Sequence, residues 1–147
     1  MQTISEYLNT IEGDKKQATT AIYHTILNNI PAGFQAEISC KMIGFVVPHS
    51  IYPAGYHCSP KLPLPFINIA AQKNAIVLHH LGIYADENLR ICLESEYPKH
   101  SKTKLDMGKV CIRFKKMNKI TLEIIAALSQ KMTVQNWIDC YEKFLKK

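Results

Sequence analysis

The segment "KLDMGKVCIRFKK", residues 104–116, carries the residue types in this chain that are best suited to chemistry. Lys109, Cys111 and Arg113 alternate there with three apolar residues. In a β-strand this spacing places both cations beside the thiol on one face. Two such cations can hold a phosphate or carboxylate group, and they favour a thiolate over a thiol. The segment therefore predicts an anion site around a cysteine.

Plainer interpretations of the same residues stay open. Alternating charges are common on solvated strand faces, and Asp106 could pair with one of the cations. A nucleophilic cysteine also needs a base that a third group holds in place, and the sequence alone brings no histidine to Cys111. An inert, partly covered thiol is therefore the first expectation. Gly108 favours the site interpretation, because glycine permits a tight backbone approach just before the strand.

Further candidate residues lie outside this segment. Lys41 or Lys73 could join the anion site, and His57 lies in a proline-rich stretch. His79 and His80 are adjacent on a predicted strand, so they face opposite sides and only one of them could meet His57. We expect His57 to pack against a neighbouring tyrosine. Close pairs such as CxxC or HxxxH are absent from the sequence, so we expect no structural zinc site.

The 147 residues fit one domain that spans the whole chain, 1–147. The hydrophobic fraction of 47% and the charged fraction of 20% are ordinary for a folded soluble protein. No apolar run reaches the roughly 18 residues of a membrane span, and the N-terminus does not resemble a signal peptide. Five cysteines without a CxxC pair fit a reducing compartment. These features predict a cytoplasmic protein without a membrane partner.

The net charge of +6 is concentrated between residues 99 and 119, a segment that contains eight lysine or arginine residues and one acidic residue, Asp106. Nucleic acid is not favoured as the partner, because few aromatic residues flank this run and no helix-turn-helix, zinc-finger or ribonucleoprotein signature is present. A small anionic ligand or an acidic protein surface fits better. Since no catalytic motif is complete, we predict a non-catalytic binding protein without a cofactor. An enzyme that uses Cys111 or His57 is a third alternative.

The elements that position these residues follow from the hydrophobic period. Helical spacing occurs before Pro31, between Asp86 and Pro98, and after Thr121 and Thr133. Alternation instead predicts strands over 34–47, as one strand or a hairpin bent near Gly44, over 66–71 and 75–84, and around "VCIRF".

The segment 48–65 holds five of the seven prolines and shows no regular pattern. It is longer than most connections in compact domains. We interpret it either as a functional loop or lid, or as a rigid surface loop that Tyr52, Tyr56 and Leu62 pack.

Helices at both ends with strands clustered between them predict an α+β two-layer sandwich, in which the N- and C-terminal helices pack on one face of a mostly antiparallel sheet. The other face is then at least partly open. Val110, Ile112 and Phe114 should face the helices, which leaves the two cations and Cys111 on the open face.

Several stretches together resemble the YdhG-like family of small bacterial proteins, a domain of unknown function. They are "ISEYLNTI", "AEISCKMIGF", "PLPFINIAAQKNAIVLHHLGIY" and "KLDMGKVCIRF". The resemblance covers roughly residues 3–142. Its most specific part is the step Gly108–Lys109 into a strand, followed by Arg113 and Phe114. The loop 48–65 is longer than in the simplest members.

The resemblance implies a frataxin-like fold, in agreement with the order of elements above. Some relatives are described as frataxin-like iron chaperones, which bind iron through an acidic ridge on the first helix and first strand. The matching region here offers the carboxylates of Glu6, Glu12 and Asp14, hard oxygen ligands suited to such ions. An intracellular iron chaperone is therefore the alternative to an anion-binding protein.

Overall fold

The described part of the protein contains one antiparallel sheet of five strands. The computed structural model describes residues 3–39, 41–73, 75–100, 105–108, 111–116 and 120–144. The strands are β1 (Gln35–Ser39), β2 (Met42–Val47), β3 (Leu64–Ala71), β4 (Ile76–His80) and β5 (Cys111–Phe114). Their order in the sheet is the order in the sequence, and each pair is antiparallel. Lys109, which was predicted for the anion site, and Val110, which was predicted to face the helices, lie outside the described residues.

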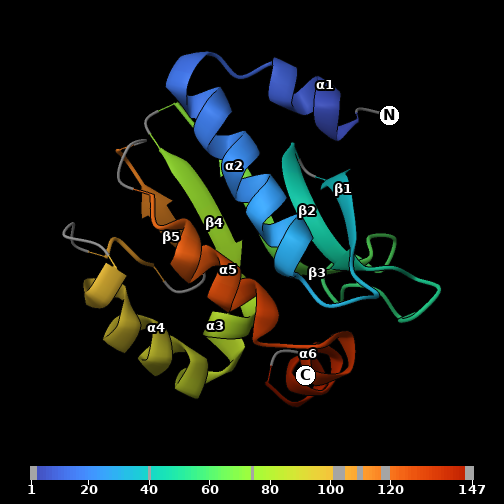
Figure 1. Cartoon of the computed structure of the whole chain (residues 1–147). Helices are drawn as coiled ribbons and strands as arrows, with labels where there is room; N and C mark the ends of the chain where they lie inside the picture. Colours follow the sequence, from blue (N-terminus) through green and yellow to red (C-terminus); the bar gives the residue numbers. More distant parts are fainter. Residues whose placement is uncertain are drawn as a thin grey trace.

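Six helices accompany this sheet in the described ranges. They are α1 (Ile4–Asn9), α2 (Gly13–Asn29), α3 (Leu81–Ala85), α4 (Glu87–His100), α5 (Leu122–Gln130) and α6 (Val134–Phe144). Helices α2 and α5 lie side by side across one face of the sheet, and α4 lies outside α5 (Figure 1). Helix α6 packs instead at the end of the sheet where β3 begins, with Trp137 against Phe66. The predicted α+β class is confirmed.

The core lies between the sheet and the helices α2 and α5. Ile22 and Ile26 of α2 and Ile125 of α5 are almost fully buried against the sheet. The sheet contributes alternate residues from each strand, such as Ile69, Leu78 and Ile112. This burial fixes which face of each strand points away from the helices, because successive side chains of a strand point to opposite sides.

Two elements end at other residues than the hydrophobic pattern indicates. The β1–β2 hairpin turns at Lys41, which has a φ of 63°, whereas Gly44 continues within β2. Alternation did not reveal this turn, because lysine is an uncommon residue in the left-handed region. The strand predicted over 75–84 ends at His80. The ring of His80 accepts a hydrogen bond from the backbone N–H of Ile83 and so caps α3.

The stretch before β5 folds back along it. Met107 forms an antiparallel bridge with Ile112, and the backbone N–H of Arg113 donates to the Asp106 carbonyl oxygen at 2.8 Å. The N–H of Gly108 donates to the Cys111 carbonyl oxygen at 2.8 Å. A Cβ atom on Gly108 would lie 3.1 Å from the sulfur of Cys111. The glycine thus allows the backbone to pass close to the thiol.

Candidate functional site

The sheet face that points away from α2 and α5 carries a row of polar side chains. Asn68 pairs directly with His79 across β3 and β4, and His79 pairs directly with Cys111 across β4 and β5. Direct antiparallel partners have Cβ atoms about 4.5–5.5 Å apart. An amide, an imidazole and a thiol are therefore neighbours on this face. The neighbouring His80 is fully buried on the other face, so the two histidines are opposed as predicted.

A pocket of about 250 Å³ opens on this face. Its polar lining consists of Asn68, His79 and Tyr56, and the remaining lining is apolar. The apolar lining residues are Met42, Val46, Leu62, Pro63, Pro65 and Leu81. Several of them belong to the segment 48–65, so the proline-rich loop forms one wall of the pocket.

The amide of Asn68 and the imidazole of His79 have no hydrogen-bond partner in the part of the chain that the structure describes. Asn68 lies over Gly44, where a Cβ atom would approach its Oδ1 to 2.9 Å. His79 is about half-buried, and this burial lowers its pKa below the ordinary value. The ring of His79 is therefore neutral near pH 7, and it has both a donor and an acceptor nitrogen to offer.

Arg113, which was predicted for the anion site, shares one carboxylate with Lys115. Asp106 Oδ1 lies 3.0 Å from Arg113 Nη1, and Asp106 Oδ2 lies 3.3 Å from Lys115 Nζ. Slight burial acts to raise the pKa of Asp106, but the hydrogen bonds and charges of Arg113 and Lys115 outweigh it and lower that pKa. Arg113 pairs with Val77 and is thus two residue pairs along from His79 and Cys111, on the same face of the sheet. The structure brings Cys111 and Arg113 to the open face, with Asp106 competing for the cation.

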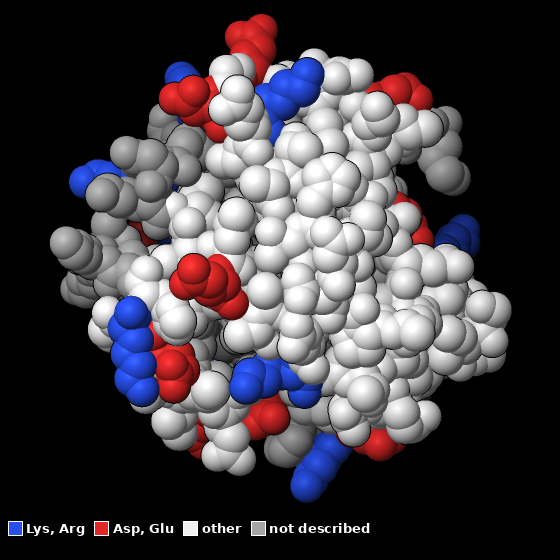
Figure 2. Space-filling view, in the orientation of Figure 1, with Lys and Arg blue, Asp and Glu red and all other residues white. Residues whose placement is uncertain are grey.

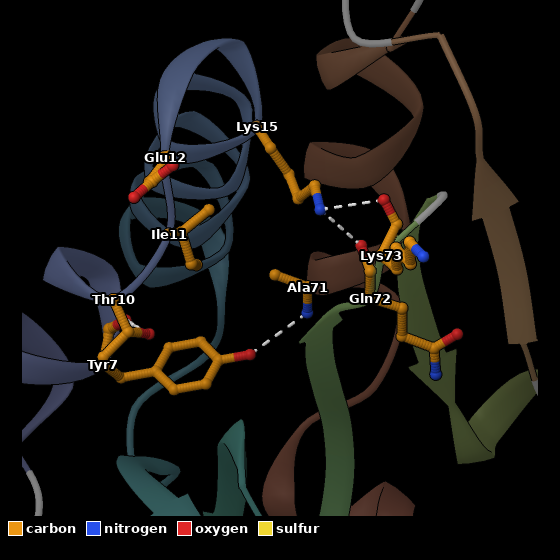
Figure 3. A pocket seen from close by; sticks show the side chains of 8 residues that line it. All are labelled: Tyr7, Thr10, Ile11, Glu12, Lys15, Ala71, Gln72 and Lys73. Carbon is orange, nitrogen blue, oxygen red and sulfur yellow. Dashed lines mark hydrogen bonds between the residues drawn. The ribbon is translucent and has the colours of Figure 1, made fainter.

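The other predicted lysines lie in turns. Lys41 immediately precedes Met42, which lines the open-face pocket. Lys73 follows β3 and lines a second pocket of about 330 Å³ at α1 and the start of α2 (Figure 3). There Lys15 Nζ donates to the carbonyl oxygens of Gln72 at 2.7 Å and Lys73 at 3.1 Å. Lys73 therefore does not belong to the pocket that Asn68 and His79 line.

The three carboxylates considered for iron lie near the N-terminus. Glu6 Oε1 accepts a hydrogen bond from the hydroxyl of Thr3, whose Oγ1 accepts the backbone N–H of Glu6 and so caps the start of α1. Glu12 lines the second pocket, and Asp14 lies in the first turn of α2. Within the described ranges, no group of three or more histidine, cysteine or acidic residues is arranged to hold a metal ion.

A second polar cluster lies in the proline-rich loop. His57 Nδ1 hydrogen-bonds to the hydroxyl of Tyr141 on α6, and the backbone N–H of His57 donates to the same oxygen at 2.8 Å. On the opposite side of the ring, His57 Nε2 lies 3.3 Å from the sulfur of Cys58. Tyr56 packs edge-on against the His57 ring, with 5.2 Å between ring centroids, so the predicted packing against a tyrosine is confirmed.

The two clusters meet at Tyr56, which lines the open-face pocket and also interacts with Cys58. Burial raises the pKa of Tyr56, and a side-chain hydrogen bond with Cys58 and the charges of Cys58 and Tyr141 raise it further. Tyr141 lies 84 positions from His57 in the sequence, so no local pattern indicates their contact. Asn68 was not predicted as a site residue either, because it lies within the strand 66–71, whose other residues are apolar.

The loop itself is braced at several points. Gly55 has a φ of 66°, and a Cβ atom there would lie 2.5 Å from the carbonyl oxygen of Pro60. The backbone N–H of Tyr56 donates to the Leu62 carbonyl oxygen at 3.0 Å. Trp137 Nε1 donates to the carbonyl oxygen of Pro65 at 3.0 Å. These contacts hold the His57 cluster against α6.

On the helix-covered side, the acidic and basic side chains of the described residues do not gather in one patch (Figure 2). They are scattered, mostly toward the margin, and a wide uncharged area is visible between them. None of the helices in the described part is both long and apolar enough to cross a bilayer.

The fold and the site define an α+β protein with a mainly apolar pocket on the uncovered face of its sheet. Comparisons of the chain with protein-family models, with curated proteins and with solved structures found no match.

Proposed function

We propose that this chain is a non-catalytic binding protein, whose open sheet face takes a small ligand with an apolar body and an anionic group. One observation carries the proposal. Asn68 and His79 are side by side in a mainly apolar pocket, and their side chains have no hydrogen-bond partner among the described residues. A pocket with an apolar wall and a few convergent polar groups is the usual form of a small-molecule site.

The energetics favour a ligand with mixed character. Polar groups that are half-removed from water lose part of their hydration, and a ligand that hydrogen-bonds to them restores this loss. The wall of Val46, Leu62 and Pro65 gains from covering an apolar body. A ring or short chain with a polar end therefore suits the pocket better than a fully hydrated ion.

We place the anionic group of the ligand next to Arg113. This cation lies diagonally from His79 on the open face, within the 7–8 Å at which long side chains still interact. Asp106 holds the guanidinium at present, so an incoming carboxylate competes with it. We expect Asp106→Asn to strengthen the binding of an anion about two- to fivefold and Arg113→Gln to weaken it by a similar factor.

An NMR titration with benzoate tests the proposal, with benzyl alcohol as the uncharged probe of the same shape. Benzoate should shift the backbone amide signals of Asn68, His79 and Cys111, and benzyl alcohol should shift them with lower affinity. The double variant Asn68→Leu/His79→Phe should lose both responses, while Lys73→Ala, at the second pocket, should keep them. Unchanged titrations of the double variant would remove the proposal.

We also infer that the α+β arrangement is frataxin-like and that the chain is a YdhG-like protein of the cytoplasm. Support comes from the residues quoted for the resemblance, from the antiparallel sheet in sequential order, and from helices of both chain halves on one face. The four cysteines within the described ranges are free, as in a reducing compartment. An experimental structure that departs from the frataxin topology would overturn the first inference.

A further inference from the structure

We propose that Cys58 exchanges with small disulfides, that His57 accepts the proton of its thiol, and that Tyr141 positions the imidazole. The proposal concerns the loop cluster alone and does not depend on the ligand of the open-face pocket. It rests on three side chains placed in series, with the thiol at the surface and the tyrosine in the core.

The geometry is that of a nucleophile, a base and an orienting group. Cys58 Sγ lies 3.3 Å from His57 Nε2, and His57 Nδ1 bonds to the Tyr141 hydroxyl. Tyr141 is fully buried, so its oxygen is a fixed reference point for the ring. This order of groups is the arrangement by which proteins activate a thiol or hydroxyl that is otherwise a weak nucleophile.

The tautomer of His57 decides which nitrogen is the base, and we assign the ring proton to Nδ1, on the side of Tyr141. The Tyr141 oxygen already accepts the backbone N–H of His57 at 2.8 Å, and a hydroxyl oxygen can accept a second hydrogen bond. With the proton on Nδ1, the lone pair of Nε2 points to the sulfur. The ring can then take the thiol proton and still donate to Tyr141.

The position of Cys58 allows a disulfide from solution to reach its sulfur. Cys58 is exposed, whereas Cys92, Cys111 and Cys140 are partly covered. A thiolate there would accept a hydrogen bond from the imidazolium that the proton transfer creates at His57 Nε2. Charge-assisted hydrogen bonds of this kind stabilise the anion.

The step balances without a further reactant. The proton of Cys58 moves to His57 Nε2, and the thiolate attacks one sulfur of the disulfide R–S–S–R. The bond from Cys58 Sγ to that sulfur forms as the original S–S bond breaks, and the departing thiolate takes the proton back from the imidazolium. Cys58 is oxidised to a mixed disulfide, half of the substrate is reduced to a thiol, and the reverse step regenerates both.

Hydroxyethyl disulfide, a small uncharged disulfide, is the probe for this reaction. The native chain is incubated with it at pH 7, quenched with acid, and mapped by peptide mass spectrometry at each cysteine. We expect Cys58 to form the mixed disulfide at least about tenfold faster than in the same chain unfolded in urea. Equal rates for Cys58 in the folded and unfolded chain would overturn the proposal.

Two variants separate activation from mere exposure. His57→Gln keeps the size of the side chain but removes the base, and it should reduce the rate at Cys58 about tenfold while the rate at Cys92 stays the same. Tyr141→Phe removes the orienting hydroxyl, so the rate at Cys58 should fall and its dependence on pH should move toward that of His57→Gln. Variants that stay folded by circular dichroism and react at the original rate would refute the roles of His57 and Tyr141.

Discussion

His80 Nε2 donates a hydrogen bond to the carbonyl oxygen of Leu128 at 3.1 Å, which ties the end of β4 to α5 through the core. The other ring nitrogen, Nδ1, accepts the backbone N–H of Ile83 at 3.2 Å. Because Nδ1 accepts, the ring proton must be on Nε2. The ring is fully buried, and a Cβ atom on Gly82 would approach its Cε1 to 2.8 Å. His80 is therefore held as a neutral imidazole with one tautomer.

This burial predicts a loss of stability in acid. Burial lowers the pKa of His80 to about 4 in the folded chain, while the unfolded chain keeps the ordinary histidine pKa of 6.5. Between these values the unfolded state binds more protons, so the contribution is complete above pH 6.5 and is lost as the pH falls toward 4. The shift corresponds to about 3 kcal/mol of unfolding free energy. Urea unfolding curves from pH 7 down to pH 4 measure it.

His80→Asn provides the matched control, because asparagine can still cap α3 but does not titrate. We expect this variant to be less stable at pH 7 and to lose less stability between pH 7 and pH 4. A pH dependence as steep as that of the original chain would show that His80 does not cause the loss.

Gly44 and Asn68 should be coupled. A methyl group at position 44 would come within 2.9 Å of Asn68 Oδ1, so Gly44→Ala should lower the free energy of unfolding by about 1–3 kcal/mol. Asn68→Ser shortens the side chain and should remove most of this penalty in the double variant. Thermal unfolding of the four proteins gives the interaction energy, and simple additivity would contradict the predicted contact.

Lys15 should fasten α2 to the β3–β4 turn. Its two hydrogen bonds to backbone carbonyl oxygens are exposed to solvent, so Lys15→Met should cost only about 0.5–1 kcal/mol of unfolding free energy. Lys16→Met is the control, since Lys16 bonds to the side chain of Asn9 instead. Amide hydrogen exchange in the turn should quicken in the first variant, and equal exchange in both would contradict the assignment.

Trp137 should anchor the end of the proline-rich loop. It is fully buried, and Trp137→Phe removes the donor to the Pro65 carbonyl oxygen, which should cost about 1–3 kcal/mol. The chain has one tryptophan, so unfolding of this variant is followed by circular dichroism. The exposed Leu122 supplies the control Leu122→Ala, which should change the stability by less than about 0.5 kcal/mol. A similar effect of both changes would contradict the anchoring role.

The local sequence pattern was enough to predict several features of the structure. The alternation around β5 predicted that Ile112 and Phe114 are buried, and this is confirmed, with Cys111 partly covered and Arg113 exposed. The same argument separated His79 from His80. Such predictions hold because side-chain direction along a strand is a local property of the backbone.

Other features depended on partners far along the chain. The pairing of Asn68 with His79 follows from strand register, and the contact of His57 with Tyr141 follows from the position of α6. The pairing of Asp106 with a cation of the predicted anion site was an open alternative until the distances to Arg113 and Lys115 were known.

The sequence by itself determined the α+β class, the inward and outward faces of the strands, and the position of the irregular loop, since hydrophobic period and proline content act over a few residues. Only the tertiary structure decided which polar side chains share a surface. Register and helix docking are set by the burial of the whole core, and no local pattern encodes that sum. For this reason the thiol at Cys111 was visible from the start, whereas the Cys58, His57 and Tyr141 series emerged only when α6 was placed against the loop.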